Sequence, residues 1–188
     1  MLLCGIINEL NKAGMKDWNV VYYFCQATHY QHNKATSVLR GLIFSLLSQQ
    51  HTLLESVREE IDKASGEMFQ DLNGWAALCR IFGRLMEEME RRQQTTYLII
   101  DALDECLEGQ HGLLKWIADL SSSHIRVLVS SRNWRLIESG LSNATQKVLL
   151  QLELNADSIS TSMDHYIDYK AAELATSKDL DTETQEAV

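Results

Sequence analysis

Three acidic residues follow a short apolar run near the middle of the chain. The run 97–100 leads directly into Asp101, and Asp104 and Glu105 come three and four residues later. A carboxylate at the carboxyl end of a buried parallel strand lies where such sheets bind ligands. In nucleotide hydrolysis, an acid at this position holds Mg²⁺, usually through water, and a nearby acid polarises the attacking water. The pattern predicts Asp101 as the metal-binding residue and Asp104 or Glu105 as the catalytic one.

The same acidic pattern also has a purely structural interpretation. Acidic side chains are common in the first turn of a helix, where they offset the positive end of the helix dipole. Asp104 or Glu105 would then mark a strand-to-helix turn and nothing more. The two acids that follow the strand-end aspartate make the functional interpretation the more specific one.

A basic residue follows the next apolar run. The run Ile125–Val129 is followed by Ser130, Ser131 and Arg132. If this run is the next parallel strand, Arg132 lies at the same edge of the sheet as Asp101. A guanidinium there can bind the γ-phosphate of a nucleotide through paired, charge-assisted hydrogen bonds. The alternative is a surface arginine at the end of a strand.

The spacing of apolar residues predicts the elements that position these side chains. Residues that recur every three or four positions predict helices, and continuous β-branched or aromatic runs predict strands that are buried on both faces. The predicted helices are 2–10, 38–47, 75–89, 113–120 and about 158–174, and the predicted strands are 20–25, 97–100, 125–129 and 148–154. Strands that alternate with helices favour an α/β fold, a parallel sheet with helices on both faces.

The composition is that of an ordinary globular domain. The chain has 188 residues, of which 45% are hydrophobic and 23% are charged, and it contains no proline. This is enough apolar material to bury a sizeable core. Lys and Arg total 17 against 26 for Asp and Glu, which gives a net charge of −9. Because nucleic-acid binding requires a basic surface, we predict no nucleic-acid partner.

The cysteines and the apolar segments indicate the cellular setting. Cys4, Cys25, Cys79 and Cys106 are scattered without a C-x-x-C pair, which argues against a zinc ribbon and a disulfide framework. No uncharged apolar run reaches the roughly 18 residues of a membrane-spanning helix. The apolar N-terminus lacks the basic segment and cleavage site of a signal peptide. We predict a cytoplasmic protein with no membrane partner.

Two weaker signals do not lead to a site prediction. His29 and His32 are spaced like a pair of metal ligands, but no third ligand lies near them in the sequence. Cys106 follows two acids, but no histidine is placed by the sequence to activate it as a nucleophile. We predict that Cys106 is buried as a small apolar side chain.

The order of these motifs resembles the NACHT domain of fungal NOD-like receptors, which belong to the STAND class of P-loop NTPases. The resemblance is closest to vegetative-incompatibility-type proteins and to the nephrocystin-type N-terminal domain, and it extends over nearly the whole chain. The matching segments are 1–10 (the helix after the phosphate loop), 23–28 and 35–43 (the second strand and helix), 97–106 (the Walker B motif), 130–132 (the sensor arginine) and 152–155 (the exit from the last strand).

This resemblance implies a three-layer P-loop NTPase-like sheet and the cofactors Mg²⁺ and ATP or GTP. It implies Asp101 as the metal-binding residue, Asp104 and Glu105 as the catalytic acids, and Arg132 as the cofactor-binding residue. It further implies that the strand ending in Asp101 lies between the two strands 20–25 and 125–129. The strand of the phosphate loop would lie between 125–129 and 148–154.

One family motif, G-x-x-x-x-G-K-[ST], is missing from the chain. Its backbone N–H groups and its lysine bind the nucleotide phosphates. We expect that the chain begins just after this loop, without the first strand, and that it binds nucleotide weakly or not at all by itself. Residues 1–155 are interpreted as a partial NACHT domain and residues 156–188 as the start of the helical region that follows.

Two functions therefore stay open. The first is a fragment of a nucleotide-dependent signalling switch in fungal non-self recognition, whose partners are nucleotide, further copies of itself or other STAND proteins. The second is a non-enzymatic, degenerate NACHT module that binds other STAND chains without nucleotide. The family implies NTPase activity, and the missing loop leaves that activity open for this chain.

Overall fold

The computed structural model describes residues 2–12, 18–64, 71–120, 124–142, 165 and 167–170. The elements in chain order are α1 (Leu2–Lys12), β1 (Trp18–Phe24), α2 (Ala35–Gln49), η1 (His51–Leu53), α3 (Leu54–Ala64), α4 (Asp71–Arg91), β2 (Thr95–Asp101), η2 (Leu103–Glu105), α5 (Gln110–Asp119), β3 (Ile125–Val129) and α6 (Arg135–Gly140). The chain divides into two compact units, Met1–Gln146 and Lys147–Val188. All of these elements belong to the first unit, and the described residues of the second are helical.

The three strands form one parallel sheet in the order β1-β2-β3. In this register Val21 is opposite Leu98, and Leu98 is opposite Val127. The prediction that the strand ending in Asp101 is the middle one of three parallel strands is therefore confirmed. The predicted strand 148–154 lies outside the described residues, so its place in the sheet stays a prediction.

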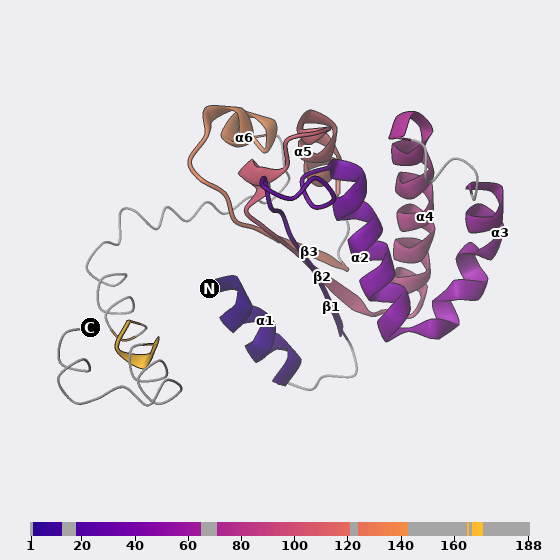
Figure 1. Cartoon of the computed structure of the whole chain (residues 1–188). Coiled ribbons are helices and arrows are strands. Elements are labelled where there is room, and N and C mark those ends of the chain that lie inside the picture. Colours follow the sequence, from indigo (N-terminus) through magenta and orange to yellow (C-terminus); the bar gives the residue numbers. More distant parts are fainter. Residues whose placement is uncertain are drawn as a thin grey trace. The chain divides into compact units, whose positions relative to one another are not determined.

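Helices cover both faces of the sheet, as predicted. Helix α1 lies on one face, and α2 and α4 lie on the other (Figure 1). On the α1 face, Leu3 and Ile7 pack against Val20 and Ile99. Neighbouring strand residues such as Leu98 point to the opposite face, because side chains alternate along a strand. Coverage of both faces explains the apolar runs of β1 and β2. The prediction that 125–129 is also buried on both faces is wrong, because Arg126 and Leu128 of β3 are exposed on one side of the sheet.

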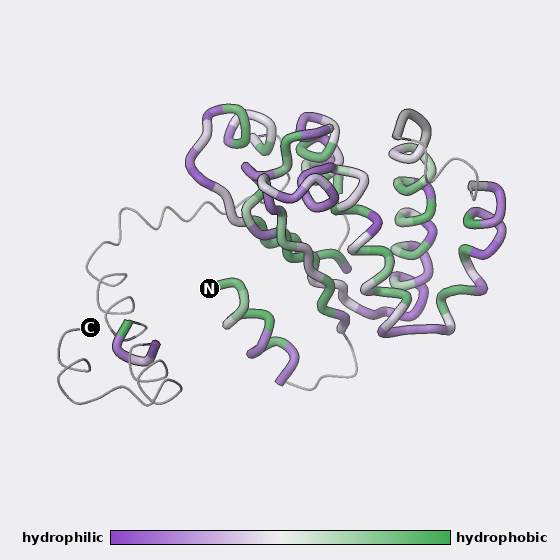
Figure 2. The backbone as a smooth tube through the Cα atoms, viewed as in Figure 1, coloured by the Kyte–Doolittle hydropathy of each residue, from purple (hydrophilic) through white to green (hydrophobic). Residues whose placement is uncertain are grey.

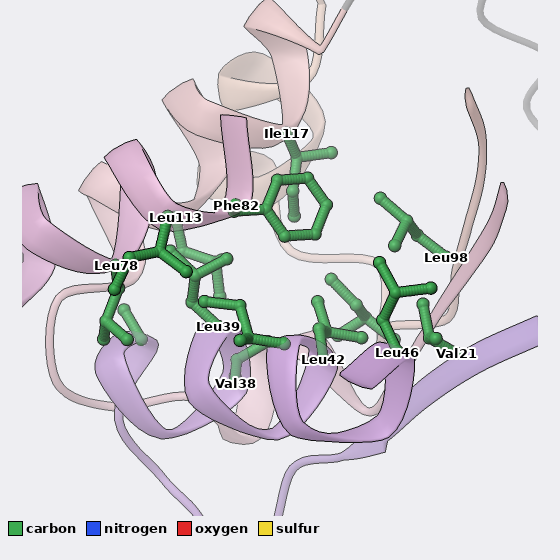
Figure 3. Close-up of a cluster of buried hydrophobic side chains, with 14 of the residues drawn as sticks. Val21, Val38, Leu39, Leu42, Leu46, Leu78, Phe82, Leu98, Leu113 and Ile117 are labelled. Carbon is green, nitrogen blue, oxygen red and sulfur yellow. The ribbon is translucent and has the colours of Figure 1, made fainter. Parts of the chain in front are cut away.

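The larger core lies between the sheet and the helices α2, α4 and α5. Along α2 and α4, hydrophobic residues recur between hydrophilic ones (Figure 2). Apolar residues that recur every three or four positions give a helix an apolar side that can be buried. Leu42, Phe82 and Ile117 come from these three helices, and their side chains converge on the same cluster (Figure 3). Among the described residues, no helix is both long enough and apolar enough to span a membrane.

Most predicted helix and strand centres are confirmed, while several ends differ. The helix predicted from residue 38 begins at Ala35, and the one predicted for 75–89 is longer, Asp71–Arg91. The spacing of apolar residues predicted neither α3 nor α6 as a helix. Helix α3 is strongly polar and is covered on one side, where Val57 is fully buried. Helix α6 has 6 residues, too few to repeat an apolar pattern.

Candidate functional site

The carboxyl ends of the three strands meet at one edge of the sheet. Phe24 is opposite Asp101, and Ile100 is opposite Val129. The pairing continues one residue beyond β3, because the Ser130 N–H donates to the Ile100 carbonyl at 3.0 Å. The residues that follow each strand are therefore brought to the edge where α/β sheets bind ligands.

Asp101 ends β2 and is held by Ser130 from the neighbouring strand. The Ser130 hydroxyl donates to Asp101 Oδ1, and the same hydroxyl accepts the Ala102 N–H at 3.0 Å. Ala102 has a left-handed backbone with φ 52°, so the chain turns sharply after Asp101. The Ser130 carbonyl also accepts the Leu103 N–H at 2.9 Å. Ser130 thus fixes both the carboxylate and the turn that follows it.

Asp104, on the short helix η2, is buried and faces Arg132. Its exposed fraction is 3%. Asp104 Oδ1 accepts the backbone N–H of Arg132 at 3.0 Å, and Oδ2 accepts the side-chain Nε–H at 2.7 Å. A buried carboxylate requires such compensation, and hydrogen bonds between charged groups are the strong ones. Both oxygens of Asp104 are therefore engaged by one residue.

Glu105 lies next to this pair and is more accessible, since 32% of its side chain is exposed. Its Oε2 accepts the Ala27 N–H at 2.9 Å. Its Oε1 lies 3.9 Å from Arg132 Nη2, at the outer limit of an ion pair. One oxygen of Glu105 is thus anchored by backbone, while the other faces the guanidinium.

The Arg132 side chain is 67% exposed although its Nε is bound by Asp104. The ring of Trp134 lies over the guanidinium, with 5.7 Å between Arg132 Cζ and the ring centroid. This separation is within the range of a cation–π interaction. Arg132 is therefore contacted both at its Nε edge and on one face.

The acid loop, residues 101–109, is also fixed to the loop that follows β1. The carbonyl of Asn33 accepts the N–H groups of Leu107 and Glu108 at 2.8 and 3.1 Å. The Glu108 carboxylate lies 3.2 Å from Lys34 Nζ, whose side chain is buried. The acid loop is therefore held from β1 on one side and from β3 on the other.

Two buried thiols adjoin the acid loop. Cys25 follows β1, and Cys106 follows η2. The hydrogen bond with the Cys106 thiol, and then burial, raise the pKa of Cys25 above its ordinary value, and the charges of Asp101 and Glu105 act in the same direction. Cys25 is therefore a protonated thiol at neutral pH. The predicted burial of Cys106 is confirmed.

The four residues predicted from the sequence thus gather at one edge of the sheet: Asp101, Asp104, Glu105 and Arg132. Sequence reasoning missed Ser130 and Trp134. For Ser130, the available signal was its place directly after a strand that neighbours the strand of Asp101. For Trp134, it was an aromatic residue two positions after the arginine.

The carboxylates of the site differ in the oxygens that they leave for a further ligand. Mg²⁺ prefers oxygen ligands, keeps several waters, and is commonly bound by one or two carboxylates together with substrate phosphates. Asp104 is occupied by Arg132, and Asp101 keeps one carboxylate oxygen beyond the one bound by Ser130. Within the part of the chain that the structure describes, no group of three or more ligating side chains could hold a metal ion.

His29 and His32, the weaker metal candidates, lie in the loop after β1. Their rings are in edge contact, with centroids 4.5 Å apart. The His32 ring also lies 6.2 Å from that of Tyr23. In the described ranges, no third ligating side chain joins the two histidines.

A parallel sheet with helices on both faces and a carboxylate–arginine cluster at its carboxyl edge is an α/β domain of the P-loop-like kind. The chain belongs to the family described as Nephrocystin 3, N-terminal, whose model matches residues 1–132. That match includes Asp101, Asp104, Glu105 and Arg132.

A particular relative is the Vegetative incompatibility protein HET-E-1 of Podospora anserina, which is 49% identical over 177 residues. The alignment covers 93% of this chain and 13% of the relative, so the chain spans a small part of that protein's length. No solved structure is significantly similar to the chain. The resemblance to nephrocystin-type and fungal vegetative-incompatibility proteins is therefore confirmed.

Proposed function

We propose that this chain is the phosphate-sensing part of a nucleotide-dependent signalling protein of the fungal incompatibility type. The observation that carries the proposal is the Asp104–Arg132 pair. This pair holds a largely exposed guanidinium at the same sheet edge as the strand-end carboxylate of Asp101. The family and the name of the fungal relative support the signalling setting.

Each side chain has a role that its surroundings allow. A bound Mg²⁺ neutralises charge on the phosphate oxygens of ATP or GTP. Asp101, whose other oxygen is fixed by Ser130, would hold that cation. The Nη groups of Arg132 would donate to the terminal phosphate, because its Nε is already bound by Asp104.

Between the two catalytic candidates, the surroundings support Glu105 as the residue that orients water. A general base must come within hydrogen-bond reach of the proton it abstracts. Asp104 is 3% exposed and has both oxygens bound to Arg132, so we propose it as a positioning residue for the arginine. Glu105 is more exposed, and backbone binds one of its two oxygens.

The proposal is tested by titrating the chain with a fluorescent ATP analogue in the presence and absence of Mg²⁺. We expect weak, saturable binding that requires Mg²⁺ and that falls at least about tenfold in Asp101→Asn, a change of about 1.4 kcal/mol. Glu55→Gln is the matched control, because it removes a carboxylate of similar charge from an exposed ion pair with Arg58. Equal affinities in all three proteins would reject the role of Asp101.

One observation favours the alternative function, a non-enzymatic interaction module. Asp104 and Arg132 form an ion pair without a nucleotide, so the guanidinium needs no ligand to balance its charge. In that case the partners would be further copies of the chain or related signalling chains. Absence of binding at high micromolar nucleotide, with the fold intact, would favour this module over the phosphate sensor.

A further inference from the structure

Trp134 places an aromatic ring over the exposed guanidinium of Arg132. The tryptophan is 44% exposed, and its ring centroid lies 5.7 Å from Arg132 Cζ. Trp134 belongs to neither of the two core clusters of the described residues. Core formation therefore does not account for its position over a charged group at a candidate ligand site.

The backbone explains how the ring reaches the guanidinium. The Trp134 N–H donates to the Arg132 carbonyl at 2.8 Å, which closes a tight turn and brings the two side chains to one side. The Trp134 carbonyl accepts the N–H groups of Ile137 and Glu138, both at 3.0 Å, at the start of α6. Trp134 is thus anchored by its backbone on both sides, so its ring is presented from a fixed base.

The contacts of Arg132 define the orientation of its guanidinium plane. Asp104 binds the Nε edge, with 2.7 Å between Nε and Oδ2. That single hydrogen bond fixes one edge but leaves rotation about it. A ring on one face restricts this rotation, because the cation–π contact stabilises the orientation in which the guanidinium plane faces the ring. With both contacts present, the Nη edge is the part of Arg132 that can meet a ligand, since Glu105 approaches Nη2 only to 3.9 Å.

We propose that Trp134 is a positioning residue that orients the guanidinium of Arg132 for binding an anionic, phosphate-bearing ligand. The orientation itself is a property of the free chain. Its use on a nucleotide phosphate rests on the function proposed above. A cation–π contact at an exposed site corresponds to about a two- to five-fold shift in the equilibrium between the oriented and free side chain.

The first measurement needs no ligand, because it follows the hydrogen exchange of the Arg132 Nε–H group by NMR in the whole chain. We expect Trp134→Leu to accelerate this exchange about two- to five-fold and Trp134→Phe, which keeps a ring face, to accelerate it less. Leu136→Ala is the control, because Leu136 is also an exposed apolar side chain of the same segment. Unchanged exchange in Trp134→Leu would overturn the proposal.

The hydrogen exchange of the Ile137 and Glu138 amides distinguishes an orienting role of Trp134 from a merely structural one. These two N–H groups donate to the Trp134 carbonyl at the start of α6. If Trp134→Leu accelerates these amides as much as the Arg132 Nε–H, the ring supports α6 and the proposal is overturned. If only the Arg132 group accelerates, the ring acts on the guanidinium.

The second measurement is the affinity for Mg·ATP. We expect Trp134→Leu to weaken it about two- to five-fold and Leu136→Ala to leave it unchanged. If Trp134→Leu accelerates the exchange of the Arg132 Nε–H group but leaves the affinity for Mg·ATP unchanged, the proposed use of Trp134 in ligand binding is overturned. If the unmodified chain binds no Mg·ATP, the proposed nucleotide function fails, while the exchange measurement still decides whether Trp134 orients Arg132.

Discussion

Asp104 binds Arg132 twice, through the backbone N–H at 3.0 Å and through the side-chain Nε–H at 2.7 Å. The two contacts do different things. The backbone bond ties the residues after β3 to η2, and the side-chain bond fixes the guanidinium. A change of the carboxylate therefore affects the fold of the acid loop as well as the orientation of the arginine.

We predict that Asp104→Asn lowers the free energy of unfolding by about 1–3 kcal/mol. The amide keeps the volume of the carboxylate, but it loses the charge of a 3% exposed group that accepts two hydrogen bonds. The measurement is urea unfolding followed by circular dichroism. Glu9→Gln is the control, because its ion pair with Lys12 is mostly exposed and such pairs contribute at most about 1 kcal/mol. Similar losses in both variants would contradict a stabilising role for Asp104.

The strands β1 and β2 could be predicted from the sequence because their buried residues are covered on both faces, whereas Arg126 and Leu128 of β3 are exposed. Val20 packs under α1, and Val21 packs under the helices of the other face, so no polar residue interrupts the run. The strand order came from the family resemblance. Residue spacing alone does not place the strand ending at Asp101 between its neighbours.

The division of roles between Asp104 and Glu105 could not be predicted. Both are acids on one three-residue helix, and local sequence does not tell which of them faces β3. The choice is made by tertiary contacts: Arg132 binds one carboxylate, and the backbone of Ala27 binds the other. Tertiary contacts also explain why α2 begins at Ala35 and not at residue 38. The Ala35 N–H donates to the Glu108 carbonyl of the distant acid loop at 2.8 Å.

Gly41 permits the close approach of α2 to β1. A Cβ atom at this position would lie 2.5 Å from Tyr23 Cδ2 and 2.8 Å from Cε2. We predict that Gly41→Ala is destabilising by about 1–3 kcal/mol, because the half-buried ring must move. In thermal unfolding, this variant should melt below the unmodified chain.

Gly83 provides the matched control for that substitution. It lies within α4, and a Cβ atom there would meet nothing within 4 Å. Gly83→Ala should therefore be stabilising by up to about 1 kcal/mol, the difference in helix propensity between the two residues. Equal effects of the same sign at both glycines would show that backbone entropy, and not the contact with Tyr23, decides the outcome.

The four free cysteines should differ in reactivity. Burial and the hydrogen bond with Cys106 keep Cys25 protonated by raising its pKa, whereas Cys4 is exposed. Because the thiolate is the reactive form, iodoacetamide at about pH 8 should modify Cys4 first. Cys25 and Cys106 should react only after denaturant is added, because both side chains are buried. Peptide mass spectrometry measures the order, and rapid modification of Cys25 in the folded chain would contradict it.

The ionisation of Tyr23 should make the fold sensitive to alkali. Burial, followed by the neighbouring thiols of Cys25 and Cys106, raises the pKa of Tyr23 from its ordinary 10.0 to about 12. The folded chain therefore holds the phenolic proton more tightly than the unfolded chain does. By linkage, this contribution to stability is complete below pH 10.0 and is lost as the pH rises through about 12.

The expected result is a free energy of unfolding that falls faster in the unmodified chain than in Tyr23→Phe as the pH rises from about 9 to about 12. Phenylalanine keeps the ring against α2 but cannot ionise, so the difference between the two proteins isolates this one group. Loss of the hydrogen bond with Ser37 lowers the stability of Tyr23→Phe by an amount that is constant below about pH 10. Urea unfolding at several pH values gives both curves. If their separation does not change with pH, the phenol ionises equally in the folded and unfolded states, and its burial against α2 does not hold the proton.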